Sequence, residues 1–155
     1  MSLDFSGTIS VRAGSQEAFL RLTDVQWISG CLPTLTELRI ISESEFEATF
    51  KVDVSEAARK VHVEYLSQVT VKMKFKFLKK EPQEVILEGS GRVVGSSLKI
   101  RIEFKVADSG NASVIPWRAT VDAGLLLRFF GEALIKETAD QIIDSVIRCI
   151  SSKLS

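Results

Sequence analysis

Apolar and polar residues alternate at a period of two through most of the middle of the chain, and this alternation constrains the fold more than any other feature. In 98–106 every second residue is a large apolar one, and the residues between are Lys, Arg or Glu. Such a pattern indicates a half-buried β-strand with one face toward a core. Similar patterns predict seven strands, at 5–11, 35–41, 45–54, 61–77, 85–93, 98–106 and 115–121.

Two of the predicted strands carry irregularities. The segment 61–77 is unusually long for one strand, so we expect a bulge or a sharp bend near Ser67. Gly89 and Gly91 interrupt the strand at 85–93. These glycines do not precede a helix, which argues against a phosphate-binding loop and favours a strand bend or a close approach of the backbone.

The period changes to that of a helix after Gly124. From Leu125 to Lys153 apolar residues recur three or four positions apart, and charged residues occupy the opposite face. This predicts one C-terminal helix of about 28 residues. Two short helices are expected earlier, at 15–22 with Ser15 as its N-cap and at about 25–31.

Length and composition limit the class of protein. The chain has 155 residues, of which 45% are apolar, and it is expected to form one domain over 1–155. Lys plus Arg and Asp plus Glu number 20 each, so the net charge is zero and a globally basic nucleic-acid binder is not expected. No apolar run approaches the roughly 20 residues that span a bilayer, and no signal-peptide pattern is present, so we expect a cytoplasmic location.

The two cysteines are Cys31 and Cys149. They lie far apart in the sequence and without Cys-x-x-Cys spacing, which indicates neither a zinc site nor a disulfide framework. Both are expected to be reduced and packed.

The predicted elements can be combined in only a few ways. Only the C-terminal helix is large enough to cover the apolar face of the sheet. A strongly twisted sheet curls, and one helix about 10 Å wide leaves a cavity beneath it. We therefore expect an α+β fold, a seven-stranded curved antiparallel sheet wrapped around a long C-terminal helix, with two short helices after the first strand closing one end near Trp27. This arrangement resembles the helix-grip fold of the START-related, polyketide-cyclase-like (SRPBCC) superfamily.

Several short motifs occur in an order that is similar to one family within that superfamily. They are Phe5-x-Gly7, Val11-x-Ala13, Leu22-x-Asp24, Cys31-Leu32-Pro33, Glu88-Gly89-Ser90-Gly91, Gly95-Ser96 and Val121-x-Ala123-Gly124-Leu125. Together they resemble the CoxG-like family, named after the CoxG subunit of carbon monoxide dehydrogenase, over nearly the whole chain. Thr34 stands where a glycine is usual in that family, and 54–66 is longer than the usual connection.

The resemblance implies a non-catalytic accessory or carrier protein. Its implied ligand is a hydrophobic small molecule, a quinone or a lipid. Its implied partners are an oxidoreductase of the carbon monoxide dehydrogenase type, which is a molybdoenzyme, and, peripherally, the inner face of a membrane.

A ligand of this kind would lie between the inward strand residues and the C-terminal helix, with access near 27–33. The candidate ligand-binding residues are Trp27, Leu32, Phe50, Met73, Phe75, Ile102, Phe104, Trp117, Leu127, Phe130 and Leu134. The alternative is that the same side chains simply fill a closed core, since ligand sites and cores are both apolar.

The inward phase of the predicted strands contains no Asp, Glu, Lys, Arg or His. His62, the one histidine, falls on the outward phase. We therefore expect no catalytic residue, no metal site and no cofactor. Because a fold does not fix a function, a small cyclase or hydrolase-type enzyme and an interaction module without a ligand remain alternatives.

Charges are segregated along the chain, with a net charge of +5 in 68–106 and −4 in 42–58. If the two segments are neighbouring strands, cross-strand pairs neutralise much of this face. The alternative is a basic surface for anionic lipid headgroups or for an acidic partner.

Overall fold

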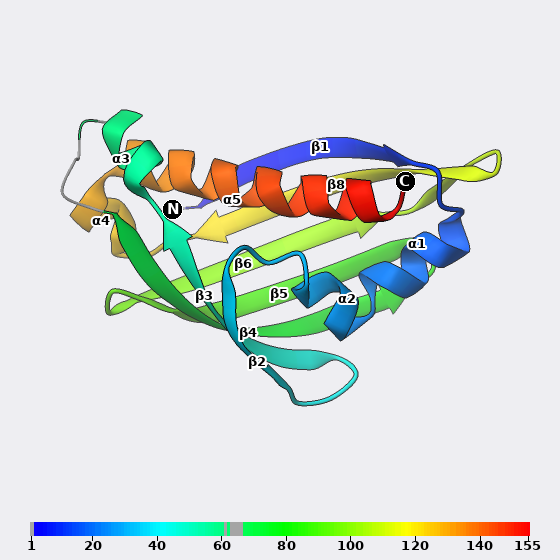
Figure 1. Cartoon of the computed structure of the whole chain (residues 1–155), viewed down its shortest axis with the longest axis horizontal. Helices are drawn as coiled ribbons and strands as arrows, with labels where there is room; N and C mark the ends of the chain where they lie inside the picture. The colour runs from blue at the N-terminus through cyan, green and yellow to red at the C-terminus, as the bar shows by residue number, and fades with distance from the viewer. Residues whose placement is uncertain (1, 61, 63–66) are drawn as a thin grey trace.

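The computed structural model describes residues 2–60, 62 and 67–155 of the chain (Figure 1). Its elements, in order, are β1 (Leu3–Val11), α1 (Ser15–Leu22), α2 (Val25–Ser29), β2 (Leu35–Ile40), β3 (Glu45–Asp53), α3 (Ser55–Lys60), β4 (Gln68–Glu81), β5 (Glu84–Val93), β6 (Ser96–Lys105), β7 (Ala107–Ser109), β8 (Ala112–Asp122), α4 (Leu126–Phe130) and α5 (Glu132–Lys153).

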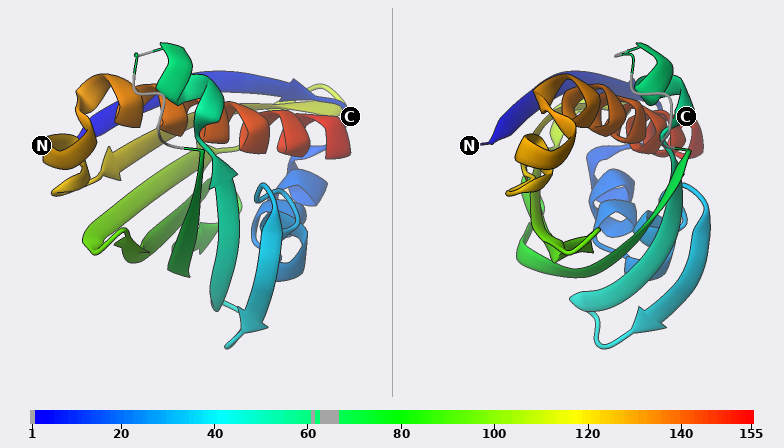
Figure 2. Two further views of the ribbon diagram at one scale, coloured as in Figure 1. Left: turned by 60° about the vertical axis from the view of Figure 1, so that its left-hand side comes forward. Right: turned by 90° about the vertical axis from the view of Figure 1, so that its left-hand side faces the viewer.

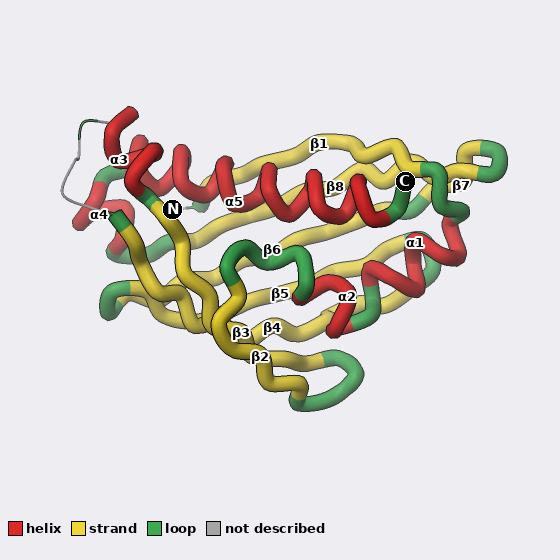
Figure 3. Tube along the Cα trace, in the orientation of Figure 1, coloured by secondary structure: helices red, strands yellow, loops and turns green. Residues whose placement is uncertain are grey.

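The strands form one antiparallel sheet in the order β1-β8-β6-β5-β4-β3-β2, and the short β7 pairs with β8. The sheet curls through most of a circle, and α5 lies across its open side, as Figure 2 shows. Figure 3 shows α5 running along the sheet from the α4 end to the α1 end. The predicted fold class, a curved antiparallel sheet around a C-terminal helix, is confirmed.

The C-terminal helix is divided, which corrects the prediction of one uninterrupted helix. Gly131 separates α4 from α5 and has a φ of 83°. Glycine adopts this left-handed backbone conformation without the steric cost that a side chain imposes. The break lets α4 change direction at the end of the sheet, although apolar spacing continues through it.

The first helix also begins differently from the prediction. Gly14 is the N-cap of α1 and supplies no side-chain hydrogen bond, so the prediction of Ser15 as the cap is wrong. In α2, by contrast, the Asp24 carboxylate accepts a hydrogen bond from the Gln26 backbone N–H at 3.0 Å.

The long strand expected at 61–77 begins only at Gln68. Residues 55–60 form α3, a helix that was not expected, and His62 lies in an exposed turn with a φ of 62°. The part of the prediction that falls on 61 and 63–66 lies outside the described residues. Within the described part of β4, a register shift occurs between Phe77 and Lys79, where β4 pairs with β5, and the pairing with β3 is regular from Gln68 to Lys76.

A disulfide joins Cys31, after α2, to Cys149 in α5, so the prediction that both cysteines are reduced is wrong. Their Cα atoms lie 5.5 Å apart, within the usual range for a disulfide. The two residues are 118 positions apart in the sequence, and only the packing of the α2 end against α5 brings them together.

Among the described residues, no helix is both long enough and apolar enough to cross a membrane.

Candidate functional site

A cavity of about 180 Å³ lies between the concave face of the sheet and α5. Strands β3, β4, β5, β6 and β8 form its floor, and the helix side is made by Leu134, Ile135, Thr138, Ala139, Ile142, Ile143, Val146 and Ile147. Ile28 and Leu32 line the end near α2, and Leu126 and Phe130 line the end at α4. The cavity arises because α5 bridges the curled sheet without filling its concave side.

Seven of the eleven candidate residues line this cavity. They are Leu32, Phe75, Ile102, Phe104, Trp117, Phe130 and Leu134. The other four do not. Phe50 and Met73 are buried in the core beside the cavity, Leu127 is half-buried on α4, and the Trp27 ring lies under the Lys153 ammonium, with Nζ 5.2 Å from the ring centroid.

Most of the residues on the helix side of the cavity are absent from the candidates predicted from the sequence. The signal was available, because Leu134, Thr138, Ile142, Val146 and Ile150 are spaced four apart and form one stripe along α5. The first four line the cavity, whereas Ile150 is fully buried in the core. Thr138 is the one hydroxyl residue in that stripe.

Two of the aromatic side chains that line the cavity lie flat on glycines of the neighbouring strand. Phe75 in β4 is directly opposite Gly89 in β5, and Trp117 in β8 is directly opposite Gly7 in β1. A Cβ added at Gly89 would lie 2.7 Å from Phe75 Cε1, and one added at Gly7 would lie 2.9 Å from the Trp117 ring. The predicted close approach at Gly89 is confirmed. The missing side chains at Gly89 and Gly7 leave the space that the rings of Phe75 and Trp117 occupy in the cavity wall.

The described lining contains no Asp, Glu, His, Lys, Arg or Cys, and Thr138 supplies its one hydroxyl. Thr138 Oγ1 is buried and has no hydrogen-bond partner among the described residues. No group of three His, Cys, Asp or Glu residues that could hold a metal ion occurs in the described part of the chain.

The helix α3 packs against one end of the cavity, and an ion pair joins it to α5. Lys60 Nζ of α3 donates a hydrogen bond to Glu137 Oε1 of α5 at 2.8 Å. This hydrogen bond lowers the pKa of the Glu137 carboxyl and raises the pKa of Lys60. Ala57 and Ala58 of α3 are buried against Leu134, which lines the cavity.

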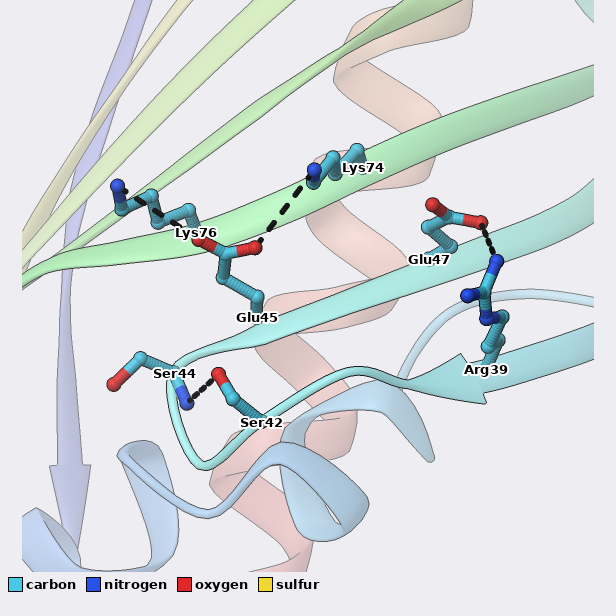
Figure 4. A network of polar contacts seen from close by, with 7 residues as sticks. All are labelled: Arg39, Ser42, Ser44, Glu45, Glu47, Lys74 and Lys76. Atoms are coloured by element: carbon cyan, nitrogen blue, oxygen red, sulfur yellow. Dashed lines mark hydrogen bonds and ion pairs between the residues drawn. The ribbon is translucent and has the colours of Figure 1, made fainter.

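The outer face of the sheet carries paired charges, which are shown in Figure 4. The acidic strand β3 is the neighbour of the basic strand β4, as the cross-strand interpretation required. The Glu45 carboxylate lies 3.8 Å from Lys74 Nζ and 3.7 Å from Lys76 Nζ. Glu47 pairs with Arg39 of β2 at 3.7 Å. Cross-strand pairing of the two segments is confirmed.

The model of the CoxG family, which describes the CoxG subunit of carbon monoxide dehydrogenase, matches residues 7–155. The chain belongs to the CoxG family. No curated protein matches the sequence.

Solved structures share the fold of this CoxG-family chain at low sequence identity. A conserved protein from Geobacillus kaustophilus is 14% identical with a TM-score of 0.78, over 98% of this chain and 95% of that one. A START superfamily protein from Mycobacterium smegmatis is 10% identical with a TM-score of 0.69, over 97% and 96%. The Zhui aromatase/cyclase from Streptomyces sp. R1128 is 9% identical with a TM-score of 0.67, over 99% and 94%. These likenesses show that the chain shares the fold of these proteins.

Proposed function

We propose that this CoxG-family protein is a non-catalytic accessory or carrier protein that binds an apolar small molecule between the sheet and α5. One observation carries the proposal: the described lining of the cavity is apolar apart from the Thr138 hydroxyl and the Trp117 indole N–H. Ligand sites are typically concave and mostly apolar, with few polar groups. Each CH₂ group transferred from water into such a site contributes about 0.8 kcal/mol.

The size of the cavity limits how much of a ligand it holds. At about 180 Å³ it is close to the roughly 150 Å³ cavity that accepts benzene and below the range of about 300 to 1,000 Å³ for drug-sized ligands. It therefore suits one ring or a short chain. The ligands that we propose from the family are a quinone or a lipid. Such a molecule would place one ring or a short stretch of its chain in the cavity, and the cavity would have to lengthen to hold more of it.

The α4 end of the cavity is a better candidate for the ligand entrance than the α2 end. At the α2 end the Cys31–Cys149 disulfide ties the chain beside Leu32 to α5. At the other end α4 lies near the turn between β5 and β6, and Leu125, Phe129 and Val94 are 49%, 60% and 57% exposed. Gly131, with a φ of 83°, separates α4 from α5, so α4 is not a rigid continuation of the long helix. We therefore place access at α4, rather than at 27–33.

The family description supports a role beside a carbon monoxide dehydrogenase-type oxidoreductase. We propose that the bound molecule serves that enzyme, in the cytoplasm and in peripheral contact with the membrane. Co-purification of the enzyme with the tagged protein, and separation of cell extracts into soluble and membrane fractions, test these two statements.

A cyclase-type enzyme is the second candidate, because the Zhui aromatase/cyclase has a similar fold. Such an enzyme needs an acid or a base that reaches the substrate inside the cavity. The described lining supplies neither, which favours the carrier.

Extraction of the purified protein with organic solvent, followed by mass spectrometry, tests carriage. The wild type is expected to release a stoichiometric apolar molecule. Ala139→Phe fills the cavity from α5 and is expected to release none, whereas Ala133→Phe, the same substitution at an exposed position of α5, is the control and is expected to match the wild type. A wild type that neither releases nor takes up any apolar molecule would overturn the proposal.

A further inference from the structure

The Cys31–Cys149 disulfide lies at the α2 end of the cavity between the sheet and α5. Ile28 and Leu32, on either side of Cys31 in the sequence, line this cavity. Val146, one turn before Cys149 in α5, lines it as well. The disulfide therefore joins the two sides of the cavity at this end, the chain that follows α2 and the long helix.

The segment that the disulfide holds ends in a strained residue. Thr34 has a φ of 45°, a left-handed backbone conformation that is costly for a β-branched residue. Its backbone carbonyl accepts a hydrogen bond from the Lys51 N–H of β3 at 3.2 Å. Segment 31–34 is thus attached to α5 at one end and to β3 at the other. Cutting the disulfide removes one of the attachments that hold this strained conformation.

A disulfide in the cytoplasm, where we propose that this protein works, is exposed to dithiol reductants, and disulfides found there are usually transient or redox-sensing. A thiolate of a thioredoxin-type dithiol attacks one sulfur of the disulfide and releases the other as a thiolate, and the second thiol of the reductant then displaces the protein from the mixed disulfide. Two electrons and two protons pass to the protein. The protein gains two thiols, and the reductant becomes a disulfide.

We infer that the Cys31–Cys149 disulfide is a reversible latch on the α2 end of the cavity. In the oxidised protein this end is closed and the ligand exchanges at the α4 end alone. In the reduced protein segment 31–34 moves away from α5 and opens a second entrance. The inference rests on the proposed function and adds its regulation: the thiol redox state sets how fast the carrier loads and unloads. Neither cysteine belongs to the described lining, so the bound ligand keeps the same contacts in the closed cavity.

Indane, an apolar hydrocarbon little larger than benzene, is a suitable probe for a cavity of about 180 Å³. NMR exchange measurements give its association and dissociation rates for the oxidised wild type, for the wild type reduced with dithiothreitol, and for the double variant Cys31→Ala, Cys149→Ala. Reduction is expected to raise both rates about tenfold, because loss of the cross-link makes local opening more frequent, and to leave Kd nearly unchanged. The double variant should exchange indane as fast as the reduced wild type, with or without dithiothreitol.

General loss of stability must be separated from opening at the α2 end. Val85→Ala removes two methyl groups from a fully buried core residue that is not part of the described lining, and it leaves the disulfide in place. This control should exchange indane at the rate of the oxidised wild type.

Amide hydrogen exchange locates the opening. The backbone N–H groups of Cys31 and Leu32 donate hydrogen bonds to the carbonyls of Ile28 and Ser29. Reduction is expected to speed the exchange of both amides about tenfold. The Phe129 amide, which is hydrogen-bonded within the α4 region, should be unaffected.

Three results would overturn the inference while the proposed function stands: equal indane exchange rates in the oxidised and reduced wild type, the same acceleration in Val85→Ala, or a disulfide that dithiothreitol leaves intact in the folded protein, as alkylation would show. If neither the oxidised nor the reduced wild type binds indane, the proposed function is overturned and this inference with it.

Discussion

Phe75 lies flat against Gly89, directly opposite it in the pairing of β4 with β5. A side chain at position 89 would begin 2.7 Å from Phe75 Cε1 and 2.8 Å from Cδ1, closer than nonbonded carbon atoms approach. On its other side the Phe75 ring stacks on Phe46, with the centroids 4.9 Å apart. If position 89 gains a side chain, the Phe75 ring can therefore move only toward the cavity that it lines.

Gly89→Ala is accordingly expected to displace the Phe75 ring into the cavity. Overpacking of this kind costs about 1 to 3 kcal/mol in the free energy of unfolding, and the smaller cavity should bind indane more weakly. Urea unfolding and calorimetry measure the two effects. Ser90→Ala, an exposed neighbour on the opposite face of β5, is the control and should change neither. Unchanged stability and indane affinity in Gly89→Ala would show that the ring is not held in this way.

Thr138→Val is expected to raise the free energy of unfolding by about 1 kcal/mol in the absence of ligand, because it removes a buried hydroxyl that has no hydrogen bond. Thr138→Ser keeps the hydroxyl and should show no such gain. Chemical denaturation of the three proteins measures the difference. A less stable Thr138→Val would mean that the hydroxyl is satisfied in solution.

Replacing both Cys31 and Cys149 by Ala is expected to lower the free energy of unfolding by about 2 to 5 kcal/mol, because the disulfide closes a loop of more than a hundred residues. The reduced wild type should lose a similar amount. Alkylation of the unfolded wild type should add two labels only after reduction. Two labels without reduction would contradict the disulfide.

The ion pair between Lys60 and Glu137 predicts a pH dependence. The pKa of Glu137 is lowered below its ordinary value of 4.5 in the folded protein, so its contribution to stability is present above that value and is lost as the pH falls through the folded pKa. The pKa of Lys60 is raised above its ordinary value of 10.5, so its contribution is present below that pH and is lost as the pH rises through the raised pKa.

An NMR titration of the Glu137 carboxyl measures the first of these effects. The midpoint should lie below 4.5 in the wild type and return toward that value in Lys60→Met, which removes the donor. Lys136→Met, one residue before Glu137 on an exposed position of α5, is the control and should leave the midpoint low. Equal midpoints in the wild type and Lys60→Met would contradict the pair.

The strands were predictable because alternation at a period of two is a local signal. The inward and outward faces of 98–106, for example, can be assigned without reference to any other segment. The break at Gly131 was not predictable in this way, because the apolar spacing continues through it and helices tolerate a glycine. The helix α3 was missed because its six residues are too few to show a period.

The candidate site was predictable to a similar extent. Residues such as Ile102 and Trp117 follow from the inward phase of their strands. Met73 has the same phase but is covered by neighbouring side chains, which only the packing decides. The disulfide depends on a contact between segments 118 residues apart, for which the sequence holds no local signal. Thr138 lies in a visible stripe, but its lack of a hydrogen bond is a property of the folded protein alone.

The most direct test of the account is an NMR titration of the methyl-labelled wild type with indane. Saturable shifts are predicted for the methyl groups of Ala139, Ile142 and Val146, which line the cavity, and not for the exposed Leu20 and Ile40. The shifts should disappear in Ala139→Phe and persist in Ala133→Phe. Absence of saturable shifts at the lining methyl groups, or shifts confined to the exposed residues, would contradict the binding of an apolar ligand between the sheet and α5.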